Sequence, residues 1–180
     1  VIEGGEHFFI DRFIKRIIEI IPTHERDFNS NFLYGNEVHM EDVLQLVKSY
    51  PMMAERRLVV VKNANDLFKR ISSNLQDDFL HYLQRPNPQT ILLIHLDPKI
   101  PKNTKIGKGL HDQSIHALLF DPLPDYQLAN WIIGWAKQEH KTLLSEQVAQ
   151  LLAQLVGNDL KLLSSEIDKI CTYTANIEGE

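Results

Sequence analysis

Cysteine is nearly absent from this chain of 180 residues, which contains Cys171 and no other. A single cysteine cannot form an internal disulfide, and a chain of this length can bury a core large enough to fold without one. Long apolar runs are lacking too, because none approaches the roughly 20 residues that cross a bilayer. No basic segment followed by an apolar core indicates a secretory signal. We therefore expect a cytoplasmic protein that does not associate with membranes.

An excess of positive charge is also lacking. The net charge is -5, while 43% of the residues are apolar and 24% are charged, as is typical of globular proteins. Nucleic-acid binders usually carry a basic field, so any contact with DNA would have to come from a local patch or through partner proteins.

Short β-branched runs alternate with helical patterns through the first two thirds of the chain. The run at residues 58–61 is Leu-Val-Val-Val, which is typical of a parallel strand buried on both faces. A first strand is expected to end near residue 3. Three further strands are expected within residues 28–34, 90–94 and 117–120. Helices are expected at residues 7–21, 37–50 and 72–84, with one short helix within 99–116. This alternation predicts an α/β fold with a parallel sheet and helices on both faces.

The pattern changes after Phe120. Residues 121–124 read Asp-Pro-Leu-Pro, a stiff linker, and three helical patterns follow at residues 125–140, 145–156 and 159–172. Gly157 is suited to end one helix, and Asn158 or Asp159 is suited to cap the next. The sequence thus predicts an α/β domain over residues 1–120 and a small helical lid domain over residues 121–180.

An α/β domain with a helical lid is the outline of a nucleotide-binding ATPase, yet the phosphate-binding loop is missing. The first strand-to-helix turn reads Glu3-Gly4-Gly5-Glu6, with carboxylates where a phosphate loop carries cationic and hydroxyl side chains. The buried strand at 58–61 is followed by Lys62 and not by the carboxylate that would hold magnesium. We expect no nucleotide cofactor and no catalytic residue.

Metal binding and covalent catalysis are not indicated either. The histidines have no pair three or four residues apart, and they lie at positions 7, 24, 39, 81, 95, 111, 116 and 140. With one unpaired cysteine, this spacing predicts no metal site. Asp97 is a lone carboxylate after an expected strand, and its neighbour Pro98 suggests a loop or capping role.

Two positive features stand out. Pro51-Met52-Met53 follows an expected helix at a point where a solvated tip would be usual. Methionine is soft and adaptable, so the pair could dock into a partner, although from composition alone folding back onto the core is the commoner outcome. The second feature is a basic stripe with a lysine at every third position, Lys99, Lys102, Lys105 and Lys108. It could contact DNA phosphates or, as is commoner, simply be solvated.

The sequence resembles the delta subunit family of the bacterial DNA polymerase III clamp loader. The most specific match is residues 49–64, Ser-Tyr-Pro-Met-Met-Ala-Glu-Arg-Arg-Leu-Val-Val-Val-Lys-Asn-Ala. Weaker matches agree in order and spacing, and they lie at residues 2–6, 79–83, 99–110, 131–132 and 156–160, with Glu166 further on.

This resemblance implies an AAA+-like fold that has lost its nucleotide site. It implies a clamp-binding element near residues 40–57, in which Met52 and Met53, after Pro51, insert into a hydrophobic pocket of the beta sliding clamp. The helix at residues 40–50 would strain the clamp interface. The protein would be a non-catalytic subunit of a DNA-directed DNA polymerase that opens the clamp for loading onto primed DNA.

The family also has a C-terminal collar domain, which joins delta to delta prime and to the gamma or tau subunits that hydrolyse ATP. Nothing in these residues corresponds to it, so we expect an N-terminal part that binds the clamp and reaches DNA only indirectly. Two alternatives are an active AAA+-type ATPase and a DNA-binding module that uses the basic stripe.

Overall fold

The first part of the chain is organised around a parallel sheet of five strands in the order β2-β3-β4-β1-β5. The computed structural model describes residues 1–177, and the chain divides into two compact units, Val1–Asp121 and Pro122–Glu180. The strands are β1 (Ile2–Glu3), β2 (Ser30–Tyr34), β3 (Arg57–Lys62), β4 (Thr90–Leu96) and β5 (Leu118–Leu119). All four pairings are parallel, which confirms the expected α/β fold class.

Strand β3 crosses the middle of the core. Its residues Leu58 to Val61 are at most 1% exposed, because the side chains that point to either face of the sheet are covered by apolar residues. Val59 and Val61 belong to one apolar cluster, and Leu58 and Val60 belong to the other. Burying each of these side chains contributes roughly 1.5–3 kcal/mol, so the apolar run both forms the strand and fixes its place between two layers.

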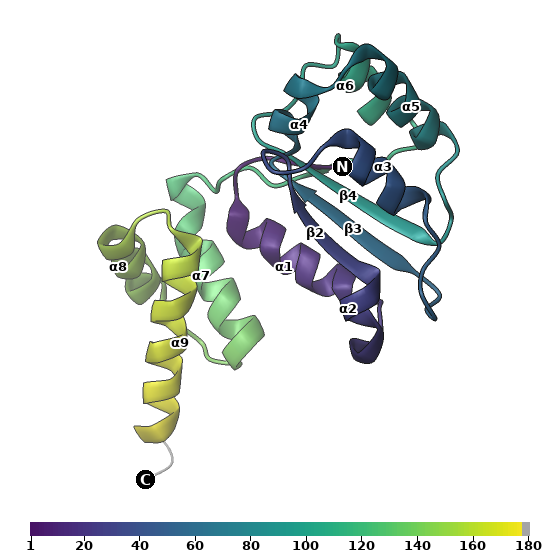
Figure 1. The fold of residues 1–180 in the computed structure, drawn as a ribbon. Helices are drawn as coiled ribbons and strands as arrows, with labels where there is room; N and C mark the ends of the chain where they lie inside the picture. The colour runs from purple at the N-terminus through teal and green to yellow at the C-terminus, as the bar shows by residue number, and fades with distance from the viewer. Residues whose placement is uncertain (178–180) are drawn as a thin grey trace. The chain divides into compact units, whose positions relative to one another are not determined.

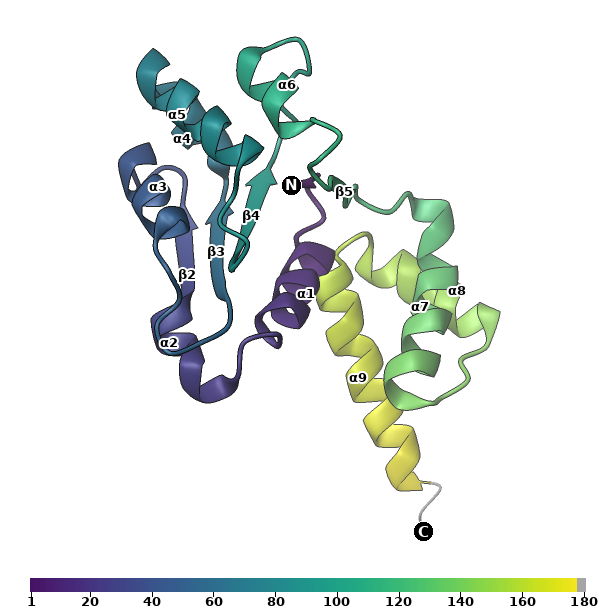
Figure 2. The same ribbon diagram turned by 90° about the vertical axis from the view of Figure 1, so that its right-hand side faces the viewer.

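Helices cover both faces of the sheet (Figures 1 and 2). Helix α1 packs on one face through Ile10 and Ile14, while the other face carries α3 to α6, whose Val47 and Phe79 are buried there. The helices of this unit are α1 (His7–Ile18), η1 (Thr23–Glu25), α2 (Arg26–Asn29), α3 (Met40–Lys48), α4 (Ala64–Arg70), α5 (Ser73–Gln84) and α6 (Lys105–Leu110).

The structure corrects several local expectations. Helix α4 was not expected, and it begins directly after Asn63, whose left-handed backbone (φ 52°) turns the chain out of β3. Phe28 lies in the single turn of α2 and not in the following strand. Strand β5 is two residues long and is paired only with β1, so Leu118 and Leu119 are partly exposed where a buried strand was expected.

The second unit contains helices α7 (Asp125–His140), α8 (Glu146–Val156) and α9 (Leu160–Ile177). Each expected helical pattern is present, and Gly157 ends α8 with a positive φ of 78°, a backbone conformation that glycine adopts without steric cost. Cys171 of α9 is only 2% exposed and is packed as a small apolar side chain. Among the described residues, no helix has the length and apolar character needed to cross a membrane.

Candidate functional site

The methionine pair lies in an exposed loop, residues 49–56, which we call the tip loop. Helix α3 ends at Lys48 because Ser49 takes an extended conformation just ahead of Pro51, and β3 begins at Arg57. Met52 is 56% exposed and Met53 is 97% exposed. Neither methionine is packed in the core, so the structure has the pair at a solvated position and not folded back.

The tip loop is held by side chains from outside it. The amide of Asn29 accepts a hydrogen bond from the Met52 backbone N–H at 2.7 Å and donates one to the Met52 carbonyl at 2.9 Å. Asn87 donates to the carbonyl of Ser49 at 3.3 Å, and the guanidinium of Arg57 donates to the Ser49 hydroxyl. The conformation of the exposed loop is therefore set by polar contacts at its base.

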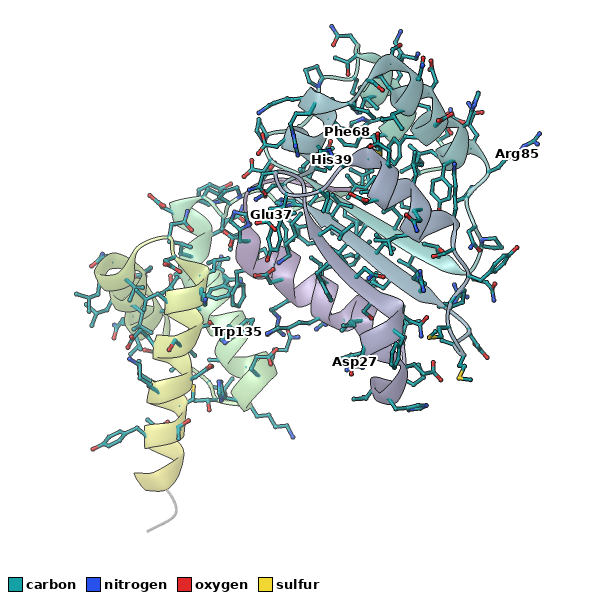
Figure 3. All side chains as sticks on the ribbon, in the orientation of Figure 1. Asp27, Glu37, His39, Phe68, Arg85 and Trp135 are labelled. Atoms are coloured by element: carbon teal, nitrogen blue, oxygen red, sulfur yellow. The ribbon has the colours of Figure 1, made fainter. Side chains whose placement is uncertain are left out.

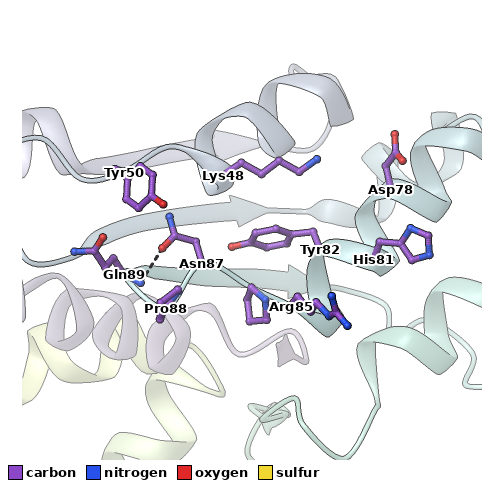
Figure 4. Close-up of a pocket in the computed structure, with 10 residues that line it drawn as sticks. Lys48, Tyr50, Asp78, His81, Tyr82, Arg85, Asn87, Pro88 and Gln89 are labelled. Carbon is purple, nitrogen blue, oxygen red and sulfur yellow. Dashed lines mark hydrogen bonds between the residues drawn. The ribbon is translucent and has the colours of Figure 1, made fainter.

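An open groove of about 620 Å³ lies beside the start of the tip loop (Figure 4). Its walls come from the end of α3, the end of α5 and the following turn, and the lining residues are Lys48, Tyr50, Asp78, His81, Tyr82, Arg85, Pro86, Asn87, Pro88 and Gln89. The side chain of Arg85 extends outward from the protein (Figure 3). The groove mixes cationic, acidic and aromatic groups, a composition that is suited to a surface contact.

Tyr82 lines the groove and is only 6% exposed. Burial raises the pKa of Tyr82 above its ordinary value of 10.0, while a hydrogen bond with the Asn87 backbone acts in the opposite direction. The hydroxyl donates to the Val47 carbonyl at 3.3 Å and so joins α5 to α3 beneath the tip loop.

The carboxyl end of the sheet is where a nucleotide would bind in folds of this class. There the turn after β1 places Gly4 at a φ of 111°, and a Cβ at that position would lie 2.2 Å from the Phe120 carbonyl oxygen. Oε1 of Glu6 accepts a hydrogen bond from the Phe8 backbone N–H at 3.1 Å, and Glu6 is 9% exposed. A carboxylate of the chain itself therefore occupies the anion-binding start of α1.

The residues at the ends of the neighbouring strands make contacts within the protein. At the end of β3, the Lys62 ammonium pairs with Asp11 at 2.8 Å. After β4, the backbone N–H of Asp97 donates to the Asn65 side chain at 2.9 Å, and that side chain donates to the Pro98 carbonyl at 2.6 Å, so Asp97 lies in a braced loop. Within the described part of the chain, no group of three or more histidine, cysteine or acidic side chains is placed to hold a metal ion.

The four lysines of the basic stripe are all exposed and lie partly in a loop and partly in a helix. Lys105 and Lys108 lie in α6, whereas Lys99 and Lys102 precede it. Lys99 pairs with Asp121 at 3.3 Å, and Lys105 forms an ion pair with Asp77. Because they follow β4, these lysines lie toward the carboxyl end of the sheet, whereas the tip loop precedes β3 at the amino end. The two groups of candidate residues are therefore not brought together.

Comparison with known proteins now identifies the family. The model for the family described as DNA polymerase III, delta subunit, matches residues 1–118. The chain belongs to this family. It is 29% identical over 185 residues to the DNA polymerase III subunit delta of Bacillus subtilis, an alignment that covers 97% of this chain and 52% of the relative.

The fold agrees with a solved structure described as the Bacillus subtilis DNA clamp loader delta protein. The TM-score is 0.78 at 24% identity, and the match covers 96% of this chain and 52% of that one. The chain thus spans about half the length of these relatives. The resemblance noted in the sequence and the parallel sheet with a helical C-terminal part are both confirmed.

The contribution of Asn29 was not foreseen from the sequence. An asparagine just ahead of a strand is an ordinary turn residue, and its partner Met52 lies 23 positions further along the chain. Its position between a short helix and a strand could have indicated a structural role for Asn29. That pattern does not predict which residue it bonds to.

Proposed function

We propose that this chain is the clamp-binding part of a clamp-loader delta subunit, which binds the beta sliding clamp and opens it for loading onto primed DNA. The observation that carries the proposal is the exposed Met52–Met53 pair on a braced loop in a chain of the delta family. Residues 40–57 are the proposed binding element, with Pro51 ahead of the pair.

Burial of the methionine side chains supplies the affinity in this proposal. Fully burying one methionine contributes roughly 1.5–3 kcal/mol, and the thioether adapts to irregular pockets. Met53, at 97% exposed, has nearly its whole surface available for burial. Few other exposed side chains of this unit could gain as much from an apolar pocket.

Opening requires more than affinity, because a ligand shifts a conformational equilibrium only by binding one state more tightly. Helix α3 directly precedes the tip loop and spans nine residues, about 13 Å at the usual rise per residue. Its buried face, with Val43 and Val47, anchors it to the sheet. In the proposal this rigid helix fits the opened clamp better than the closed one.

The proposed subunit performs no chemistry itself. Glu6 occupies the helix end that would hold a phosphate, and β3 ends at Lys62, which is followed by Asn63 and not by an acidic residue. Energy would come from ATP hydrolysis in the gamma or tau subunits. These subunits and delta prime would join through a collar in the full-length cytoplasmic protein.

Alanine substitution of both methionines tests the docking. Calorimetry with purified sliding clamp should show that Met52→Ala/Met53→Ala weakens binding at least about tenfold, as expected when two hot-spot side chains are truncated. The control is Leu143→Ala, which removes an 80% exposed apolar side chain from the second unit and should leave the affinity unchanged. Equal affinity of the methionine variant and the wild type would refute the docking.

A contact with DNA through Lys102 and Lys108 is a second proposal, separate from clamp binding. Both side chains are exposed, and neither takes part in an ion pair among the described residues. They are the members of the basic stripe whose charge is not already balanced by a neighbouring carboxylate.

A further inference from the structure

Asn29 is a buried side chain that holds the backbone of the tip loop at the methionine pair. It is 0% exposed and lies at the end of α2, before β2. Its Nδ2 donates to the Glu25 carbonyl at 3.0 Å and to the Met52 carbonyl at 2.9 Å, and its Oδ1 accepts from the Met52 N–H at 2.7 Å. Both backbone polar groups of Met52 are thus bound to one side chain.

We infer that Asn29 is a positioning residue for the methionine pair, and that it sets the affinity for the sliding clamp without touching it. This inference rests on the proposed docking of Met52 and Met53. Asn29 would fix the orientation of Met52 and Met53 in the free protein, before the clamp binds.

Only an amide satisfies this site. The neighbours are two carbonyl oxygens, which accept, and one N–H, which donates, so the side chain must offer two donors and one acceptor. A carboxylate has nearly the same shape but no donor, and it would face the carbonyls of Glu25 and Met52 with a negative charge. Asn29→Asp therefore changes hydrogen bonding with almost no change in volume.

The need for positioning follows from the next residue. Met53 has a left-handed backbone with φ 52°, an uncommon conformation for a residue with a side chain, and at 97% exposed it has almost no packing to hold it there. The hydrogen bonds at Met52 are therefore what keeps the strained turn in place. A turn ordered in advance loses less conformational entropy when it binds.

A second contact ties the same two segments together. The Arg57 guanidinium donates to the carbonyl of Phe28 at 3.4 Å and also to the Ser49 hydroxyl. Arg57, which follows the tip loop, thus bonds both to the first residue of the loop, Ser49, and to Phe28 in α2, the residue before Asn29. The loop that carries the methionine pair is therefore held by hydrogen bonds to α2 as well as by its covalent connection to α3.

The chain offers a matched control in Asn65. Its side chain binds a different loop in the same way, by accepting from the backbone N–H of Asp97 and donating to the carbonyl of Pro98. That loop follows β4, at the end of the sheet away from the tip loop. Asn65→Asp makes the same chemical change and disturbs a loop that carries no methionine.

The experiment measures clamp affinity by calorimetry below the unfolding temperature of every variant, which is determined by thermal unfolding. Asn29→Asp should weaken binding about tenfold, roughly the effect of one buried hydrogen bond on an equilibrium. Asn65→Asp should bind as the wild type does. If Asn29→Asp does not fold, Asn29→Ser serves instead, since its shorter side chain cannot reach Met52, and it should lose affinity in the same direction.

Two further readouts separate positioning from general stability. Hydrogen exchange at the Met52 amide should accelerate in the Asn29 variants and not in Asn65→Asp. In a Met53→Ala background, Asn29→Asp should weaken binding by a factor of about three or less, because neighbouring contributions to binding are not additive.

The outcomes distinguish this inference from the docking on which it rests. Unchanged affinity of Met52→Ala/Met53→Ala overturns the docking itself. A strong effect of the methionine substitutions together with wild-type affinity of Asn29→Asp overturns the positioning alone. An equal loss from Asn29→Asp with and without Met53 also overturns it, because the effect would then not act through the pair.

Discussion

Nε2 of His111 lies 2.9 Å from Oε1 of Glu3 and joins β1 to the end of α6 across 108 positions of sequence. The other ring nitrogen, Nδ1, donates to the Gly107 carbonyl at 2.8 Å, and because that oxygen can only accept, Nδ1 carries a proton. The Glu3 carboxylate is thus the hydrogen-bond partner of the second ring nitrogen. Both side chains are about a tenth exposed, so this bond lies in the interior of the first unit.

The first prediction concerns this pair. Glu3→Ala leaves a buried ring nitrogen without a partner and should lower the free energy of unfolding by about 1–3 kcal/mol. Glu3→Gln should cost less, because its side-chain amide can either donate to Nε2 or accept from it. Urea denaturation of both variants measures the difference, and an alanine variant as stable as the glutamine variant would contradict the assignment.

The second prediction concerns ATP. Calorimetric titration with ATP and magnesium should show no binding tighter than about 1 mM, a value that corresponds to only a weak interaction. The reason is the Glu6 carboxylate, which already accepts from the Phe8 N–H at the start of α1. Micromolar binding would instead favour the alternative of an active ATPase.

The third prediction concerns the basic stripe. If Lys102 and Lys108 contact phosphates of primed DNA, Lys102→Ala/Lys108→Ala should reduce the salt dependence of binding by about 1–2 in the log–log slope. Lys99→Ala/Lys105→Ala is the matched control and should have a smaller effect, since those lysines already pair with Asp121 and Asp77. Fluorescence anisotropy at several salt concentrations provides the slopes, and the same slope for wild type and Lys102→Ala/Lys108→Ala would exclude this contact.

The fourth prediction concerns pH. Because burial raises the pKa of Tyr82 in the folded protein, its contribution to stability is complete below pH 10.0 and is lost as the pH rises through the folded pKa. The free energy of unfolding of the wild type should therefore fall more steeply above pH 10.0 than that of Tyr82→Phe. Denaturation at a series of alkaline pH values tests this, and parallel curves would show that Tyr82 titrates alike in both states.

Much of the fold follows from the sequence because its signals are local. The apolar run at residues 58–61 predicts a strand covered on both faces, and β3 is that strand. Gly157 predicts the end of α8, and it lies there with a positive φ. Helix α4 was missed because its seven residues bury only Ala64 and Leu67, too short a pattern to be distinguished from a loop.

Some residues of the candidate site could likewise be located from the sequence, and others could not. Pro51, Met52 and Met53 could be located because an apolar pair after a proline is visible in the sequence. Asn29 could not, since its role depends on a hydrogen-bond partner that only the folded chain brings near. The stripe of lysines has a regular spacing in the sequence, yet its members lie partly in a loop and partly in α6, and Lys99 and Lys105 form ion pairs that the spacing does not predict.

The burial of Cys171 makes the chain convenient for site-specific labelling. Its thiol is 2% exposed in α9, and the sequence has no other cysteine. A thiol reagent applied to the folded protein should therefore react with a cysteine introduced on the surface long before it reaches Cys171. Met53→Cys would carry a fluorophore at the point where the tip loop is most exposed, and its emission would report directly whether that point becomes shielded when a partner is added.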